Sequence, residues 1–445
     1  MKKSVITTVL CTLAMGSLIL AGCNKQEPGT AQGQAGGGSG ASASSSGKSN
    51  VTITFLNSKG EIQEALENIA ADYTKQTGVK LEIVACGAGE VPYTKITTMY
   101  NSGTPPTLAM LDTTDVVALA KEYALDLSNE KWTKETTQLT KIDGTLYSFP
   151  FCIEGRGIIY NKTAIEKKLG KKFDPNSINS YKAFKAILEE LASKGMKYPV
   201  VLSKEDWSLG AHQLGFIYDT YDGTTAGSEK IINDLEGGLD PNSYKRYGQF
   251  LDTLDLLVKY NVAHADPLGA DYDEGALQLA TGEAAFWANG CWAWPNIKEG
   301  GASATDEFGF IPFVLGDDTS DFANNGIQAS ATKQVIIDKK YATAEQQQAA
   351  KDFLNWLVYD SNGQKAIVQT CALIPACTNN QFRPGDPLGA DIVNRMAANK
   401  TFSSSFIAPS DHWSVMGAHL QKYISGNSSR KELTDNLSKY WKSQK

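Results

Sequence analysis

The feature that most constrains the fold is an alternation of strand and helix patterns over residues 51–111. Residues 51–55 alternate apolar and polar side chains, as a half-buried strand does, and a polar turn follows at 57–60. Apolar residues then recur at helical spacing over 62–73, before Gly78, a typical helix end. A strand over 79–85, a helix over 93–100 and a strand over 108–111 follow. This alternation predicts an α/β fold with a parallel sheet.

The carboxyl ends of the first and third strands are the first candidate site. Ligands of open α/β sheets bind beyond the carboxyl ends of strands. This rule points to Ser58 and Lys59 after the first strand and to Asp112 and Thr113 after the third, with Asp115 close behind. Asp115 is explained equally well as an acid in the first turn of a helix, where the helix dipole favours negative charge.

The N-terminus has the pattern of a lipoprotein signal. Two lysines precede a short apolar stretch, as in a secretory signal peptide. The stretch ends in Leu20-Ala21-Gly22-Cys23, which matches the bacterial lipobox. We therefore expect cleavage after residue 22 and lipidation of Cys23; the alternative is a signal peptide with an incidental Cys. Residues 24–49, rich in Gly, Ser, Ala and Gln, predict a flexible tether to an extracytoplasmic domain.

Composition excludes several classes of protein. Of the 445 residues, 42% are hydrophobic and 20% charged, which excludes collagen, a disordered chain and a polytopic membrane protein. The net charge of −7 leaves no broad basic face for nucleic acid. Five Cys follow Cys23, and an odd number of Cys cannot all form disulfides within the chain. Cys371 and Cys377 are close enough in sequence to form a disulfide, but we favour free thiols. The four His form no ligand motif, so we expect neither a metal nor a cofactor, and read the His as surface or core residues.

The middle of the chain predicts a hairpin and a long strand. Residues 141–150 have the pattern of a hairpin with an incoming strand, which continues through Glu154 and Arg156 to Lys162. Gly155 and Gly157 flank Arg156 within this apolar strand, which suggests that the chain passes here between two units. Residues 349–358 and 420–441 are amphipathic and predict helices.

From residue 50 onward the chain resembles the extracellular solute-binding proteins of carbohydrate ABC importers, and among them the maltodextrin-binding proteins. The resemblance rests on the opening strand–helix–strand and on these segments: Tyr93-Thr94-Lys95, 102–106, 143–162, 277–285 and 289–297. It implies two α/β lobes, a multi-crossing hinge and a ligand cleft between the lobes. The expected N-terminal lobe comprises 50–153 and about 309–360, and the C-terminal lobe 154–308 and about 361–445.

The resemblance also implies an aromatic part of the site. A sugar presents C–H faces to aromatic rings and hydroxyls to charged or amide groups. Trp292, after the apolar strand 284–288, matches the family's stacking Trp, whereas Trp294 is expected in the core. Trp207 resembles a family aromatic beside an acid, with Glu205 or Asp206 as the acid. Trp413 resembles a third family aromatic or is a helix-packing residue.

Polar site residues are implied in the same way. Lys59 matches a family Lys, although Ser58 stands where maltose binders carry an acid. A solvated loop Lys is the alternative. Glu154 matches a family Glu at the first crossover, where a carboxylate accepts sugar hydroxyls. Arg156 is a counter-ion or a second ligand contact.

The sequence lacks the nucleophile-elbow, paired-His zinc and phosphate-loop motifs of common enzymes. We therefore expect no enzyme, but a monomeric, lipid-anchored protein that captures an oligosaccharide and hands it to an ABC permease. An α-glucan of the maltooligosaccharide type is weakly favoured. The alternatives are a secreted glycoside hydrolase, with Glu154 and Glu205 as its acids, and an adhesion or cell-wall lipoprotein.

Overall fold

The computed structural model describes residues 51–87 and 90–445. The predicted signal peptide, Cys23 and the tether to residue 49 lie outside this range. Within it, no helix is both long and apolar enough to cross a membrane.

The predicted strand–helix alternation at the start of the domain is confirmed. β1 (Thr52–Asn57) pairs in parallel with β2 (Lys80–Ala85) on one side and with β3 (Leu108–Asp112) on the other. The helices between these strands are α1 (Gln63–Thr77) and α2 (Pro92–Asn101). α1 buries its apolar face and ends at Gly78, whose φ of 82° is left-handed and suits glycine. The sheet therefore brings the carboxyl ends of β1 and β3 to one edge.

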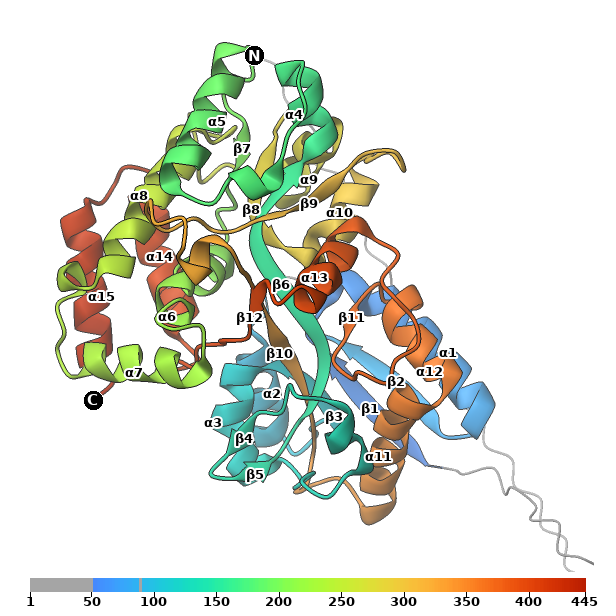
Figure 1. The fold of residues 1–445 in the computed structure, drawn as a ribbon. Helices are drawn as coiled ribbons and strands as arrows, with labels where there is room; N and C mark the ends of the chain where they lie inside the picture. The colour runs from blue at the N-terminus through green and yellow to red at the C-terminus, as the bar shows by residue number, and fades with distance from the viewer. Residues whose placement is uncertain (1–50, 88–89) are drawn as a thin grey trace, which may run out of the picture. The chain divides into compact units, whose positions relative to one another are not determined.

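A single long strand joins two halves of the main sheet. β6 (Phe149–Asn161) is buried along all of its 13 residues. It pairs antiparallel with β10 (Ile327–Ile337) in its first half, and with β8 (Phe286–Gly290) and β9 (Phe308–Ile311) in its second. The strand order is β2-β1-β3-β10-β6-β8-β7, with β7 at Val200–Val201. Figure 1 shows β6 running from the group around β1 to the group around β8.

Two large hydrophobic cores lie along β6. Phe149 and Phe151 belong to a core with Phe55 and Trp132, whereas Ile158 and Tyr160 belong to a core with Phe250. A Cβ added at Gly155 would lie 2.3 Å from the Ile392 side chain, and one added at Gly157 would lie 2.7 Å from the Ile311 carbonyl oxygen. These contacts explain the two glycines, because only a residue without a side chain fits. The first core also includes Ile367, Cys371 and Cys377, which the sequence analysis assigns to the C-terminal lobe. The lobe bounds expected from the sequence therefore stay a prediction.

The remaining elements follow the predicted order. Residues 141–146 form the expected hairpin of β4 (Lys141–Ile142) and β5 (Thr145–Leu146). The predicted late helices are α11 (Ala344–Tyr359), α14 (His412–Ile424) and α15 (Arg430–Lys442). The other strands are β11 (Ile374–Pro375) and β12 (Thr401–Phe402), and the other helices are α3 (Thr113–Tyr123), α4 (Lys162–Leu169), α5 (Tyr181–Ser193), α6 (Phe216–Asp219), α7 (Thr225–Glu236), α8 (Lys245–Lys259), α9 (Tyr272–Thr281), α10 (Trp294–Glu299), α12 (Ser361–Lys365) and α13 (Pro387–Ala397).

β10 carries an irregularity next to the site. Its register with β6 shifts on both sides of Lys333, between Ser330 and Gln334. On one side of the shift, Ser330 faces Glu154; on the other, Lys333 pairs with Asp112 of β3. A bulge bends a strand and turns side chains away from the regular alternation. Here it leaves Thr332 and Lys333 half-buried in an otherwise buried strand.

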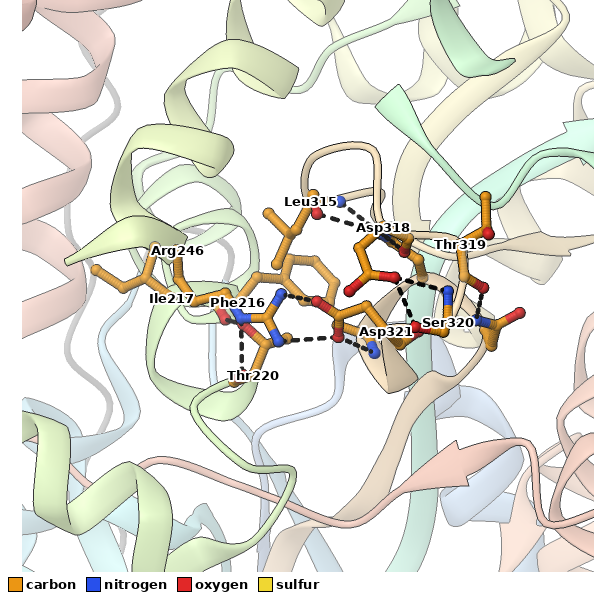
Figure 2. Close-up of polar contacts among 12 residues, drawn as sticks. Phe216, Ile217, Thr220, Arg246, Leu315, Asp318, Thr319, Ser320 and Asp321 are labelled. Carbon is orange, nitrogen blue, oxygen red and sulfur yellow. Dashed lines mark hydrogen bonds and ion pairs between the residues drawn. The ribbon is translucent and has the colours of Figure 1, made fainter. Parts of the chain in front are cut away.

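The loop that leads into β10 is fixed by one arginine. Arg246 of α8 donates two hydrogen bonds to the Asp321 carboxylate, at 2.5 and 2.9 Å, and a third to the Thr220 carbonyl at 3.0 Å (Figure 2). Asn324 closes the same loop by donating to the carbonyls of Leu315 and Asp318. Such a bidentate pair fixes geometry as well as supplying energy. The start of β10 is therefore tied to α8.

The five cysteines that follow Cys23 are free thiols, so Cys371 and Cys377 do not bridge. Both are buried, and burial raises the pKa of each thiol to about 12. They pack as small apolar residues in the first core.

Candidate functional site

A cavity of about 630 Å³ lies where β1, β3, β6 and β10 meet the segments around residues 207, 292 and 413. Seven of the nine residues chosen from the sequence line it: Lys59, Asp112, Glu154, Arg156, Trp207, Trp292 and Trp413. Two do not. Asp115 is buried in the first turn of α3, and Glu205 lines a separate cavity, whereas its neighbour Asp206 lines the main one.

A buried ion pair forms part of the cavity wall. The Lys59 Nζ lies 2.5 Å from Glu154 Oε1 and 2.6 Å from Glu61 Oε1. Lys59 is held by the side chain of Asn57, which accepts from its backbone N–H at 2.9 Å and donates to its carbonyl at 2.8 Å. The second oxygen of Glu154 accepts from the Thr332 hydroxyl at 2.5 Å. The turn after β1 thus joins β6 and β10 through Glu154.

Both members of this pair are charged. Burial alone would raise the pKa of Glu154, but the positive charges of Lys59 and Lys333 and two hydrogen bonds lower it to about 2. Burial alone would lower the pKa of Lys59, but Glu154 and Glu61 hold it well above its ordinary value. The cavity therefore presents a fixed carboxylate and a fixed ammonium group.

A second ion pair lies beside the first. Lys333 Nζ is 2.8 Å from Asp112 Oδ1. Burial opposes the charge of Lys333, but Asp112 and Glu154 raise its pKa. Burial and the negative charge of Asp112 raise the pKa of Asp115 to about 7. Asp115 therefore belongs to the electrostatic surroundings of the site without lining it.

Arg156, two residues after Glu154 in β6, forms a third pair. It binds the buried carboxylate of Asp219, donates to the Ala211 carbonyl at 3.0 Å, and lies 4.8 Å from the centre of the Phe216 ring. Asp219 also accepts from Ser404 Oγ at 3.0 Å and from a backbone N–H at 2.8 Å. Arg156 Nε is buried without a partner.

Aromatic rings cover another wall. His212 lies 4.5 Å from Trp292 and 5.3 Å from Trp207, measured between ring centres. Trp292 follows β8, and an added Cβ at Gly290 would lie 2.1 Å from its ring. Gly290 therefore permits the position that Trp292 takes. Trp413 lies in the first turn of α14.

Ser58, His212 and His412 also line the cavity, and the two His were not chosen from the sequence. In each, a side-chain atom (Ser58 Oγ and the Nδ1 of both His) is buried without a hydrogen-bond partner. Burial lowers the pKa of both His to about 3, and the Arg156 charge adds to this at His212, so both rings are neutral.

The local backbone explains why His212 was missed. Trp207 and His212 are five residues apart, which puts them on different faces of an α-helix. Residues Ser208–Gln213 instead form a π-helical turn, η4, which brings positions five apart onto one side. A sequence pattern read at α-helical spacing does not reveal this pairing.

The residues that the structure describes contain no group of three or more His, Cys, Asp and Glu placed to hold a metal. Paired charges, unpartnered polar atoms and aromatic rings suit a ligand with hydroxyl groups and apolar faces.

Comparisons with known proteins agree with this geometry. A family model described as bacterial extracellular solute-binding protein matches residues 68–384. The multiple sugar-binding protein of Streptococcus mutans is 25% identical over 316 residues, which is 65% of this chain and 66% of that protein. The match therefore spans just under two thirds of that relative.

Solved structures are similar in fold. A chitin oligosaccharide binding protein superposes with a TM-score of 0.69 at 18% identity, covering 88% of this chain and 98% of that one. The solute-binding protein RafE in complex with raffinose gives 0.69 at 17% identity, with 88% and 99% covered. A sugar transporter from Bacillus licheniformis in complex with stachyose gives 0.67 at 17% identity, with 89% and 100% covered. The expected two-lobed α/β fold is confirmed.

Proposed function

Because this chain belongs to the family of bacterial extracellular solute-binding proteins, we propose that its main cavity captures an oligosaccharide outside the cell. A lipid on Cys23 holds the protein at the extracytoplasmic face of the membrane, and the protein passes the sugar to the permease of an ABC importer as a monomer. The matched family is one of binding proteins, and the chain is a binding protein rather than an enzyme.

The observation that carries the proposal is the juxtaposition of rings and charges within one cavity. Trp207, His212 and Trp292 offer apolar faces, while Glu154, Lys59 and Arg156 supply charged hydrogen-bonding groups. Aromatic faces pack on the C–H faces of a sugar, and hydrogen bonds to charged groups hold its hydroxyls. A volume of about 630 Å³ suits more than one ring.

The mechanism we propose is closure of two lobes on the sugar. β6 contributes to both cores, and the cavity is lined by Lys59 and Asp112, which follow β1 and β3, and by Trp207, Trp292 and Trp413. A ligand that contacts both lobes only when they are closed stabilises the closed state by those added contacts. The lobes are those expected from the sequence: 50–153 with about 309–360, and 154–308 with about 361–445.

Two kinds of sugar are the first to test. The resemblance of residues 289–297 to maltodextrin binders favours α-linked glucans. The similar structures with raffinose and stachyose support galactosides as well. Three aromatic plates, Trp207, Trp292 and Trp413, favour chains of at least two rings over monosaccharides.

The experiment is calorimetry of the purified domain with maltooligosaccharides, raffinose, stachyose, chitooligosaccharides and their monosaccharides. We expect one of the oligosaccharides to bind, and Trp292→Ala to lower its affinity roughly 30-fold, since burying an aromatic face contributes about 2 kcal/mol. Trp294→Phe is the matched control, because Trp294 does not line the cavity. Absence of binding to every sugar would contradict the proposal, and release of new reducing ends would favour the hydrolase alternative.

A further inference from the structure

A second cavity of about 290 Å³ lies behind the wall of the main one. Residues 203–207, which follow β7, separate the two. Asp206 and Trp207 line the main cavity, whereas Lys204 and Glu205 line the second. The opposite wall of the second cavity is the loop 261–271 and the start of α9.

Two polar groups in this cavity lack partners. Asn261 is 1% exposed, and its Oδ1 accepts from the backbone N–H groups of Leu202 at 3.3 Å and Ala263 at 3.2 Å. These two bonds fix the amide, and its Nδ2 is buried with no acceptor. Glu205 Oε2 is likewise buried with no donor. An unpaired buried donor and acceptor are costly, so a ligand that satisfies both gains affinity.

Other carboxylates of the cavity are hydrogen-bonded within the fold. Asp266 accepts from the backbone N–H of Gly269, and Asp271 caps α9 by accepting from two backbone N–H groups. In the described chain these carboxylates form no group suited to a metal. The remaining lining includes Lys204 and Tyr272, whose hydroxyl accepts from Asn289 and keeps its own proton to donate. An aromatic ring with hydrogen-bond donors and acceptors around it suits a hydroxylated molecule.

The two cavities are in contact through aromatic residues. Tyr272 lines the second cavity, and its ring centre lies 5.9 Å from that of Trp207, which lines the main one. The volume of about 290 Å³ lies just below the usual range of ligand pockets, about 300–1,000 Å³, and so suits one ring rather than a chain.

We infer that the second cavity binds one pyranose ring, through Glu205 and Asn261, beside Tyr272. The ring comes either from the end of a chain held in the main cavity or from a free monosaccharide. The inference rests on the proposed function, because it extends sugar binding beyond Trp207.

Two substitutions test it without touching the main cavity. Ala270→Phe fills the second cavity, which Ala270 lines, and Glu205→Gln replaces one carboxylate oxygen with an NH2 donor and removes the charge. Ala304→Phe and Glu189→Gln are matched controls at exposed positions outside both cavities. Melting curves and circular dichroism verify that all four variants fold. Each variant and the parent are titrated calorimetrically with maltose, maltotetraose, raffinose, stachyose, glucose and galactose.

If the ring belongs to a chain, Ala270→Phe and Glu205→Gln lower the affinity for the longer sugar of a pair, such as maltotetraose, roughly tenfold. The affinity for the shorter sugar, such as maltose, stays unchanged. If the ring is a free monosaccharide, the parent binds it at a site that survives Trp292→Ala and is lost in Ala270→Phe. Unchanged affinities and stoichiometries in both variants overturn the inference while sugar binding by the parent stands. A parent that binds neither these six sugars nor a chitooligosaccharide overturns the proposed function itself.

Discussion

Lys59 Nζ lies 2.5 Å from Glu154 Oε1, although the two residues are 95 positions apart in the chain. The pair joins the turn after β1 to the long strand β6, with 2% and 9% of the two side chains exposed. Removing one member of a buried ion pair leaves the other charge unpaired, which typically costs about 3–5 kcal/mol.

We therefore expect Lys59→Met to lower the free energy of unfolding by about 3 kcal/mol in urea denaturation, with Glu154 still contacted by Thr332. The double variant Lys59→Met/Glu154→Gln recovers part of this loss, because the buried carboxylate is removed with its cation and only the more exposed Glu61 is left without Lys59. Lys80→Met, which breaks an exposed pair with Glu82, is the control and costs less than about 1 kcal/mol. If Lys59→Met and Lys80→Met lower the free energy of unfolding equally, the buried pair contributes no more to stability than an exposed pair.

Asp115 gives a pH prediction. Burial and Asp112 raise its pKa from 3.8 to about 7. Between these two values the unfolded chain has released a proton that the folded chain still holds, so stability falls as the pH rises from about 4 to about 7. Asp115→Asn removes this contribution. Urea denaturation at pH 5 and pH 8 should show a smaller loss of stability in the variant than in the parent. A loss of the same size in both would refute the shifted pKa.

Gly290 gives a prediction on ligand affinity. An added Cβ would lie 2.1 Å from the Trp292 ring, so Gly290→Ala must displace this ring from the cavity wall. We expect affinity for the best sugar to fall at least tenfold while the melting temperature changes by only a few degrees. Gly248→Ala, where nothing lies within 4 Å of the added Cβ, should leave affinity unchanged. A Gly290→Ala protein with parental affinity would place Trp292 outside the ligand site.

His212 gives a prediction on the pH dependence of binding. Burial and Arg156 lower the pKa of His212 to about 3, so the ring stays neutral from pH 5.5 to 8. Titration of His212 should therefore add nothing to the pH dependence of sugar affinity over this range, whereas His212→Ala should lower the affinity roughly tenfold by removing a ring that contacts Trp207 and Trp292. Calorimetry of both proteins at several pH values measures both effects. The carboxyls of Asp115 and Asp219, whose pKa values are raised to about 7 and about 6, titrate in this range, so any pH dependence should persist in His212→Ala. A pH dependence that disappears in this variant would indicate a titrating His.

Cys23 gives a prediction on location. If it is lipidated, Cys23→Ala should release the protein into the medium or leave its signal peptide uncleaved. Fractionation of cells and immunoblotting distinguish these outcomes. A variant that is still processed and membrane-bound would argue against the lipid anchor.

Local patterns were enough to predict the elements that form the first sheet. The alternation at 51–55, the helical spacing up to Tyr73 and the glycine at 78 each specify their own element. Glu154 was located through its resemblance to a family Glu at the crossover, and Arg156 as its neighbour between two glycines of the same strand. The cavity wall at His412 depends instead on long-range packing, here a hydrogen bond between His412 and Tyr218, which are 194 positions apart. No local pattern encodes such a contact.

The direction of the Glu205 side chain could not be predicted from the sequence either. Its neighbours Asp206 and Trp207 line the main cavity, yet Glu205 faces the other way. The direction of each side chain depends on how residues 203–207 leave β7 and enter η4, and η4 is π-helical. Neighbours in sequence can therefore serve different cavities.

The bidentate contact between Arg246 and Asp321 restricts where β10 can bend. Upstream, the loop before the strand is clamped to α8, and residues 328–330 are paired with β6; downstream, residues 333–337 are paired with β3. Residues 331 and 332 lie outside both ladders and are held by side chains instead: the Ala331 N–H donates to Gln138, and the Thr332 carbonyl accepts from Thr113. Thr332, whose hydroxyl donates to Glu154, thus ties the position of the bulge in β10 to the carboxylate in the cavity wall.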